Sequence, residues 1–135
     1  MRIAVLVSAM NRGGAERVAA TLANAWVAAG HDVLLIVTWS GRGGCDYALD
    51  SRVELRFLAD SAGRMPWRTL GYLGKILALR GLLLGFRADV AVSFLTNVNI
   101  LTLLAGRGIH LPVVVNERID PLANQEKNAA LEFLR

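Results

Sequence analysis

Apolar residues in this chain gather in short runs, separated by longer segments with helical spacing. The runs 2–8, 33–38 and 89–95 show no alternation of polar and apolar residues. This is typical of strands that are buried on both faces of a parallel sheet. The run 53–58 does alternate and predicts a strand with one wetter face, and 111–115 predicts a fifth strand.

The segments between these runs predict helices. The first covers 15–29 and is followed by Gly30, a residue type that suits the carboxyl end of a helix. Its expected apolar face consists of Val18, Leu22, Ala25 and Trp26. Further helices are predicted over 67–86, 98–106 and 122–135. The helix over 67–86 should break near Gly81, because each glycine costs a helix about 1 kcal/mol relative to alanine.

Strands that alternate with helices predict an α/β fold, a Rossmann-like parallel sheet with helices on both faces. A length of 135 residues suits one domain, and an apolar fraction of 54% with 19% charged residues excludes disorder. In such sheets ligands bind beyond the carboxyl ends of the strands. A site is therefore expected in the loops that follow Ser8, Thr38, Leu95 and Val115.

The net charge of +4 comes from one part of the chain. Within 64–90 the only acidic residue is Asp89, and the basic residues are Arg64, Arg68, Lys75, Arg80 and Arg87. A local basic patch of this kind attracts anionic lipid head groups or phosphates. It is too small and too rich in leucine for a nucleic-acid footprint, so no nucleic-acid partner is expected.

The predicted helix in segment 64–87 has two interpretations that its residues leave open. In one, it lies on its own sheet, packed closely through its small residues and with a solvated basic rim. In the other, it lies on an anionic membrane. The small residues are Gly74, Ala78, Gly81 and Gly85, and the leucines on the side away from Arg64, Arg68 and Lys75 are Leu70, Leu73, Leu77 and Leu84.

Neither a signal peptide nor a transmembrane helix is expected. The apolar start of the chain is too short for a signal peptide, and Lys75 and Arg80 interrupt the longest apolar stretch, 69–86. Cys45 is the only cysteine, so no internal disulfide can form. We therefore expect a cytoplasmic protein. If the membrane interpretation of 64–87 holds, that segment contacts the inner face of the cell membrane peripherally.

No metal site is expected, because His31, His110 and Cys45 lack any recognised ligand spacing. Both histidines precede predicted strands and should be surface residues at the edge of the sheet away from the ligand. Cys45 lies in a glycine-rich loop without an evident base partner. No tightly bound cofactor is expected either.

Adjacent glycines follow the first predicted strand. Gly13 and Gly14 let backbone amides approach a ligand closely, and the helix that begins there offers unpaired N–H groups to an anion. The residues equally allow a plain tight turn in which Glu16 complements the helix dipole. The dinucleotide fingerprint, the acidic residue after the second strand and the P-loop are missing, which disfavours a nucleotide-dependent oxidoreductase.

Three segments that follow the predicted strands resemble retaining GT-B glycosyltransferases of family 4. They are GGAERV at 13–18 with GHDV at 30–33, VSFLTN at 92–97, and VNERIDP at 115–121. The likeness runs in order along nearly the whole chain. It is particularly clear for the bacterial polysaccharide and lipid-linked-sugar branches of that family.

The resemblance implies that 1–135 is the amino-terminal, acceptor-side half of a GT-B enzyme, truncated at its C-terminal end. The carboxy-terminal domain that holds the nucleotide would be absent, and the isolated fragment would be inactive. The full enzyme would move a sugar, with retention, from a UDP- or GDP-sugar to a hydroxyl of a lipid-linked or polysaccharide acceptor. The nucleotide sugar would be a substrate rather than a bound cofactor.

The resemblance also assigns roles to the first loop. The amides of Gly13 and Gly14 would bind the donor diphosphate and stabilise the charge that develops on the leaving group. Arg12 or Arg17 would add a cation, and Glu16 would be a further substrate contact.

The loop after the fifth predicted strand departs from the family pattern. Many members have a histidine near this point, whereas this chain has Asn116, Glu117 and Arg118, so the role of that histidine does not carry over. Glu117 would bind sugar hydroxyls or the acceptor nucleophile without a covalent role, and its two neighbours would contact substrate. The alternative is a Glu–Arg surface pair, with Asp120 beginning the last helix and Pro121 at its first position.

Polar residues also follow the fourth predicted strand. They are Ser93, Thr96, Asn97 and Asn99. This cluster would contact the acceptor or the sugar, or Asn97 would only cap the next helix.

An alternative class of function is a non-catalytic subunit of a split transferase, which binds a partner or a membrane through an exposed face. A natural end of the chain at Arg135 would favour this module. A reading frame that continues beyond it would favour the fragment of an enzyme.

Overall fold

The structure, a computed structural model, describes residues 1–11, 13–39, 45–61 and 71–117. Its elements are, in chain order, β1 (Arg2–Val7), α1 (Gly14–Ala28), β2 (Asp32–Val37), β3 (Glu54–Phe57), α2 (Leu58–Ser61), α4 (Tyr72–Phe86), β4 (Val90–Phe94), α5 (Thr96–Gly106) and β5 (Val113–Asn116). The predictions for Arg12, Arg118, Asp120, Pro121 and the segments 62–70 and 122–135 lie outside the described residues.

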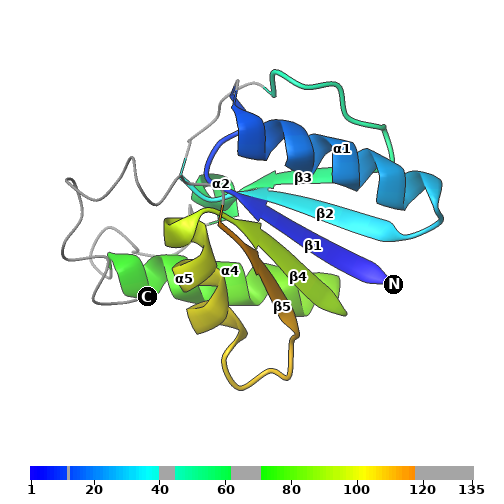
Figure 1. Cartoon of the computed structure of the whole chain (residues 1–135). Helices are drawn as coiled ribbons and strands as arrows, with labels where there is room; N and C mark the ends of the chain where they lie inside the picture. The colour runs from blue at the N-terminus through cyan, green and yellow to red at the C-terminus, as the bar shows by residue number, and fades with distance from the viewer. Residues whose placement is uncertain (12, 40–44, 62–70, 118–135) are drawn as a thin grey trace.

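The five strands form one parallel sheet in the order β3-β2-β1-β4-β5, which confirms the predicted Rossmann-like α/β fold. Figure 1 shows α1 over one face of the sheet, with α4 and α5 over the other. From β1 the chain builds outward through β2 and β3, then crosses back to β4 and continues to β5. The direction of winding reverses between β1 and β4, and ligands bind at the carboxyl side of such a switch point.

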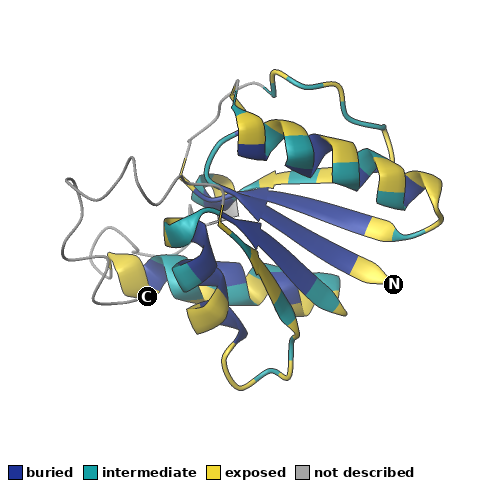
Figure 2. Cartoon of the chain, in the orientation of Figure 1, coloured by how far each residue is buried: buried dark blue, intermediate teal, exposed yellow. Residues whose placement is uncertain are grey.

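Both faces of the central strands β2, β1 and β4 are buried (Figure 2), which explains their non-alternating apolar runs. Val5 and Leu35 belong to the apolar cluster beneath α1. Leu6 and Ile36 belong to the cluster on the opposite face, which includes Leu83 of α4. The outer strand β3 alternates between exposed and half-buried residues, as its sequence predicts.

The buried face of α1 differs from the predicted one. Its buried residues are Ala15, Ala19, Ala20, Ala23 and Val27. Ala25, which its spacing assigns to the apolar face, is exposed, and the larger Leu22 and Trp26 are only partly buried. Small alanine side chains let the helix backbone lie close to the sheet, so the bulkier apolar residues pack along the flanks.

Gly30 follows the end of α1, as predicted. Its φ of +93° is a left-handed conformation that favours glycine. The N–H of Gly30 donates to the Val27 carbonyl and the N–H of His31 to the Trp26 carbonyl, both at 3.0 Å. These two bonds are those of a Schellman motif and satisfy carbonyls at the end of the helix.

Helix α4 runs without interruption through Gly81, so the predicted break is wrong. Leu79 and Leu83 are fully buried in the cluster between the sheet, α4 and α5. Burial of this kind stabilises a helix more than the propensity of its residues does, and it outweighs the cost of the glycines.

The leucines that the helical wheel grouped together on α4 face solvent. Leu73, Leu77 and Leu84 are 53%, 42% and 52% exposed. The stripe of small residues is also not packed against another backbone at all of its positions. Gly81 and Gly85 are exposed, and the position that a Cβ would take at each has no neighbour within 4 Å.

Two boundaries also differ from the prediction. Helix α5 begins at Thr96 with Leu95 as its N-cap residue, so Asn97 lies inside the first turn and does not cap the helix. The strand predicted over 53–58 ends at Phe57, and its last predicted residue, Leu58, instead begins the short helix α2.

Replacing Gly81 by Ala is expected to raise the free energy of unfolding by about 1 kcal/mol. The added Cβ meets open space, and alanine loses less backbone entropy than glycine in a helix. The melting temperature should therefore rise by a few degrees. Gly30→Ala is the matched control, because it also meets open space but must adopt φ of +93°, which costs about 1–2 kcal/mol. Equal effects of the two substitutions would contradict this explanation.

Candidate functional site

The loops at the carboxyl edge of the sheet are tied together in pairs. The backbone N–H of Trp39, after β2, donates to the backbone carbonyl of Ser8, after β1, at 2.9 Å. Leu95, after β4, donates its N–H to the carbonyl of Asn116 at the end of β5, also at 2.9 Å. The candidate site therefore has two halves that flank the switch point between β1 and β4 (Figure 1).

The half built on β4 and β5 contains an exposed carboxylate with two fixed donors. Oε2 of Glu117 accepts a hydrogen bond from the Thr96 hydroxyl at 2.8 Å, and Oε1 accepts one from the Asn99 side-chain amide at 3.2 Å. Thr96 and Asn99 both belong to the first turn of α5, whereas Glu117 directly follows β5. The structure thus brings together predicted site residues from two different loops.

Buried polar groups lie beneath this carboxylate. Ser93 is fully buried and Asn99 is 5% exposed. The Ser93 hydroxyl donates to the Asn99 side-chain oxygen at 2.6 Å, and the Asn99 amide also donates to the Asn116 carbonyl at 3.2 Å. The predicted residue Ser93 therefore uses its hydroxyl inside the protein, and Asn97, the remaining polar residue of this segment, is exposed.

Leu95 connects β4 to α5 in an unusual backbone conformation. Its φ of +75° is rare for a residue with a side chain and costs of order 1–3 kcal/mol. Its carbonyl accepts the N–H of Asn99 at 2.9 Å, which helps to set the direction of the first turn of α5. Local strain therefore occurs in the same loop that carries Thr96, beside the switch point.

The half of the site built on β1 contains the paired glycines. The N–H of Gly13 donates to the Tyr47 hydroxyl at 3.0 Å, and this hydroxyl donates to the Gly13 carbonyl at 2.9 Å. Tyr47 was not among the predicted site residues, because its contact with Gly13 spans 34 positions of the chain. The amide of Gly13 is thus engaged by this tyrosine.

Gly14 and its neighbours are arranged differently. Gly14 is exposed, and the position of a Cβ on it has no neighbour within 4 Å. A Cβ on Gly13 would instead collide with the Glu16 carboxylate, whose Cδ would be 2.9 Å away. Glu16 therefore places its charge against the amino end of α1, where a helix favours an anion. The side chain of Arg17 is exposed on the same turn.

An aromatic residue and a cation lie together after β2. The ammonium nitrogen of Lys75, on α4, is 3.4 Å from the centroid of the Trp39 ring. Burial lowers the pKa of Lys75 and raises the pKa of Tyr72, because desolvation disfavours their charged forms. Trp39 was not among the predicted site residues. Its position just after a buried strand, at the edge of the sheet where ligands bind, was the sequence signal that could have marked it as a candidate site residue.

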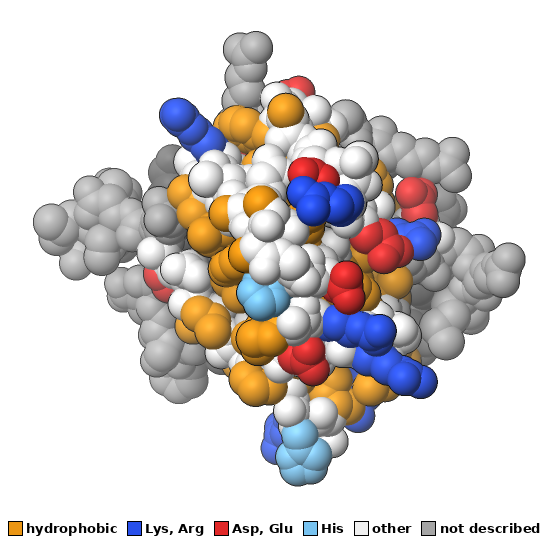
Figure 3. Space-filling model, turned by 90° about the vertical axis from the view of Figure 1, so that its right-hand side faces the viewer, with side chains coloured by type: hydrophobic (Ala, Val, Ile, Leu, Met, Phe, Trp, Pro, Cys, Tyr) orange, Lys and Arg blue, Asp and Glu red, His pale blue; other side chains and the backbone are white. Residues whose placement is uncertain are grey.

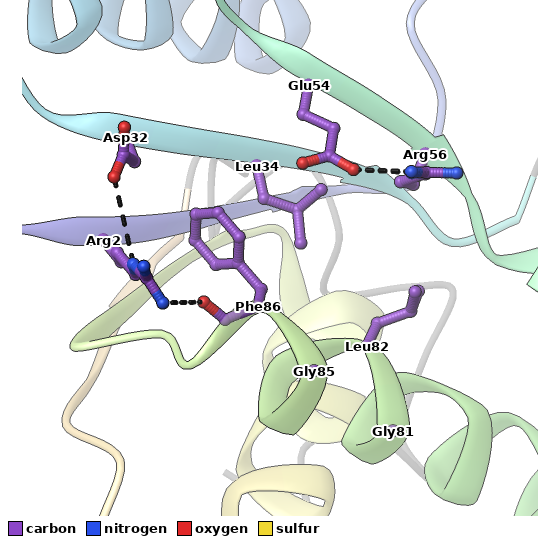
Figure 4. Close-up of a pocket in the computed structure, with 9 residues that line it drawn as sticks. All are labelled: Arg2, Asp32, Leu34, Glu54, Arg56, Gly81, Leu82, Gly85 and Phe86. Carbon is purple, nitrogen blue, oxygen red and sulfur yellow. Dashed lines mark hydrogen bonds and ion pairs between the residues drawn. The ribbon is translucent and has the colours of Figure 1, made fainter.

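The opposite, amino edge of the sheet is viewed in Figure 3, where acidic and basic side chains lie next to one another. A groove of about 450 Å³ lies at this edge between the last turns of α4 and strands β2 and β3 (Figure 4). Its charged residues are paired, Arg56 with Glu54 at 2.7 Å and Arg2 with Asp32 at 3.9 Å. None of the predicted site residues lines this groove.

The residues predicted to be inert are placed away from the network around Glu117. His31 precedes β2 and lies 3.1 Å from the amino terminus through Nδ1, and His110 is exposed in the loop before β5. Cys45 is half-buried and contacts the Tyr47 carbonyl at 3.0 Å.

Within the described ranges, no group of three or more potential metal-binding residues was found. None of the helices in those ranges has the length and apolar character needed to cross a bilayer.

Comparison with known proteins relates the chain to enzymes that transfer sugars. The family model described as "Glycosyl transferase 4-like domain" matches residues 13–135. A relative from Campylobacter jejuni subsp. jejuni serotype O:2 is 31% identical over 118 residues, which cover 87% of this chain and 32% of the relative. The relative is named GalNAc-alpha-(1->4)-GalNAc-alpha-(1->3)-diNAcBac-PP-undecaprenol alpha-1,4-N-acetyl-D-galactosaminyltransferase. The chain thus spans about a third of the length of the relative that it matches.

Proposed function

The chain belongs to the family of glycosyl transferase 4-like domains, and from this premise we propose that the complete protein is a glycosyltransferase with a lipid-linked acceptor. It moves a sugar from a UDP- or GDP-sugar to an acceptor hydroxyl. The name of the relative specifies a substrate linked to undecaprenol through PP, which favours a lipid-linked acceptor over a free polysaccharide. Residues 1–135 form the acceptor-side domain, and a carboxy-terminal domain holds the nucleotide.

The ordered Glu117 carboxylate beside the switch point is the structural observation that carries the proposal. Each of its oxygens accepts one hydrogen bond, from Thr96 or from Asn99. A carboxylate has about four lone-pair sites, so acceptor capacity remains for a hydroxyl of the sugar or of the acceptor. Glu117 then orients a hydroxyl by charge and hydrogen bonding, without forming a covalent bond.

The donor diphosphate is proposed to lie over Gly14. This residue is the first of α1, is exposed and has open space above it. Backbone N–H groups at the start of a helix stabilise an anion, and the leaving group gains negative charge as the glycosidic bond breaks. The Gly13 amide would join them if Tyr47 released it, and Glu16 would have to turn away from the phosphates. Arg17 and Arg12 are the cations proposed to assist.

The experiment that tests this function uses the complete protein. It is incubated with labelled UDP- and GDP-sugars and with an acceptor in which a sugar is joined to a polyprenol through a diphosphate. We expect label in the lipid fraction with one class of donor, and an anomeric configuration that matches the donor. The isolated 135-residue chain should give no product. If the complete protein transferred no label from any nucleotide sugar, the proposed function would be wrong.

The exposed leucines of α4 favour a peripheral contact with the membrane that carries such an acceptor. Leu73, Leu77 and Leu84 are four and seven positions apart, so they lie along one line of the helix. Arg87 is exposed at the end of the same helix, whereas Arg80 donates to the Arg107 carbonyl at 2.6 Å. An apolar line with a cation at its end suits a helix that rests on an anionic bilayer.

Replacing both Leu73 and Leu77 by Glu is expected to reduce binding to vesicles containing phosphatidylglycerol by about tenfold. The substitutions remove apolar area that would enter the interface and add charges that the anionic surface repels. Sedimentation of the complete protein with the vesicles measures the effect. Leu103→Glu on α5 is the control, since Leu103 is 51% exposed but lies outside the leucine line. Comparable losses for the control and the double variant would argue against this surface.

A further inference from the structure

We propose that Asn99, supported by Ser93, is a positioning residue that fixes the direction of the Glu117 carboxylate toward the substrate. This inference rests on the proposed function, because it concerns the same carboxylate. The observation behind it is a buried amide that connects three elements. Asn99 lies on α5, Ser93 on β4, and Asn116 and Glu117 at the end of β5.

The hydrogen bonds of Asn99 allow its side chain one orientation. Its oxygen accepts the Ser93 hydroxyl at 2.6 Å, so its nitrogen must point toward β5. The nitrogen donates to the Asn116 carbonyl and to Oε1 of Glu117, both at 3.2 Å. Rotation of the amide by half a turn would place an NH₂ group against the hydroxyl and an oxygen against two other oxygens. The Asn116 carbonyl and the Glu117 carboxylate, which can only accept, therefore set which end of Asn99 faces β5, and the Ser93 hydroxyl holds the other end of the amide.

Packing alone does not explain why this amide reaches Glu117. An unpaired buried amide is costly, but the Asn116 carbonyl already satisfies one of its N–H groups inside the fold. The second N–H points at a carboxylate that is itself exposed and could be hydrated by water. Water could replace this bond on the exposed carboxylate, but water would not hold Oε1 at one position relative to α5. Orientation of the carboxylate is the property that this bond determines.

Asn99 and Thr96 act on different oxygens of the same carboxylate. Thr96 holds Oε2 from the first residue of α5, and Asn99 holds Oε1 from three residues further along the same turn. Two donors on one rigid turn fix the plane of the carboxylate as well as its position. The hydroxyl of the acceptor then meets lone pairs that already point in one direction. This fixed orientation stabilises the transition state more than it stabilises a loosely bound ground state.

A double-mutant cycle in the complete enzyme tests the inference. Asn99→Ala should lower kcat/KM for transfer by about 10–30-fold, mostly through kcat, because a misdirected group affects the transition state more than substrate binding. In a Glu117→Ala background the same substitution should lower kcat/KM less than about twofold further, since Asn99 acts through Glu117. Ser93→Ala, a smaller change, should show the same dependence on Glu117 with a loss of about threefold.

Thr102→Ala is the matched structural control. Thr102 is fully buried on α5 and bonded to the Val98 carbonyl at 2.7 Å, so its loss tests general damage to this helix. Its effect on kcat/KM should be small and equal in both backgrounds.

If Asn99→Ala reduced transfer equally with and without Glu117, or if Glu117→Ala had no effect at all, the positioning role would be overturned while the transferase function stood. If wild-type enzyme showed no transfer, the proposed function itself would fail. Should Asn99→Ala not fold, the Ser93→Ala cycle decides.

Discussion

Glu117→Gln in the complete enzyme is expected to lower kcat/KM for sugar transfer by about 10²–10³-fold, a loss of about 3–4 kcal/mol of transition-state stabilisation. Glutamine keeps the size of the side chain but removes its charge and one acceptor oxygen. Its oxygen can still accept from the Asn99 amide, while its NH₂ group can donate to the Thr96 hydroxyl, which also accepts. The side chain then keeps its place but offers the hydroxyl of the substrate no charged acceptor.

The same substitution should change the free energy of unfolding by less than about 0.5 kcal/mol, because Glu117 is exposed. Initial rates with a labelled nucleotide sugar, together with thermal unfolding, separate the two effects. Glu54→Gln is the control, since this exposed glutamate is paired with Arg56 at the amino edge of the sheet. An unchanged rate for Glu117→Gln would leave the carboxylate without a role. A loss far beyond 10³-fold would instead indicate a covalent role, which the proposal denies.

The order of strands and helices could be predicted from the sequence, because buried parallel strands leave an unmistakable pattern. Residues 33–37 include no polar side chain, and glycines or polar loops separate such runs from helical segments. Gly30 marked the end of α1 for a local reason, its left-handed backbone. Predictions of this kind succeed because the deciding interactions lie within a few residues of one another.

The orientation of α4 could not be predicted in the same way. Leucines occur all around this helix, so hydropathy does not distinguish the side that meets the sheet. The choice depends on the shape of the space between the sheet and α5, which Leu79 and Leu83 fill. The sequence pattern grouped Leu73 and Leu77 on one side of the helix without deciding what that side meets, and in the structure both face solvent.

The candidate site was predictable in outline and not in its contacts. Topology placed the loops after β4 and β5 side by side, so Thr96 and Glu117 could be expected at one edge. The partners that hold them could not, because Asn99 and Glu117 are 18 positions apart, and Gly13 and Tyr47 are 34 apart. An asparagine between apolar neighbours in a helix, as Asn99 is between Val98 and Ile100, is the signal that points to such a contact.

Gly14→Asp is expected to have opposite effects on stability and on activity. Aspartate in the first turn of α1 interacts favourably with the helix dipole, and the loss of a glycine reduces the entropy of the unfolded chain. Together these terms should raise the free energy of unfolding by about 0.5–1 kcal/mol, since the Cβ meets open space and the backbone of Gly14 is not left-handed. The nearby Glu16 carboxylate offsets part of this gain.

The added carboxylate should raise KM for the nucleotide sugar about 10²-fold if the donor diphosphate lies over Gly14. At an effective dielectric constant of about 20, two like charges about 6 Å apart repel each other by about 3 kcal/mol. Gly14→Ala separates size from charge and should raise KM less than tenfold. The effect of Asp should also shrink at high salt, because ions screen an exposed charge.

Thr21→Asp places the same charge on an exposed position of α1 two turns away and should leave KM unchanged. A more stable Gly14→Asp variant with normal KM would show that the diphosphate binds elsewhere, and the paired glycines would then serve only the turn into α1.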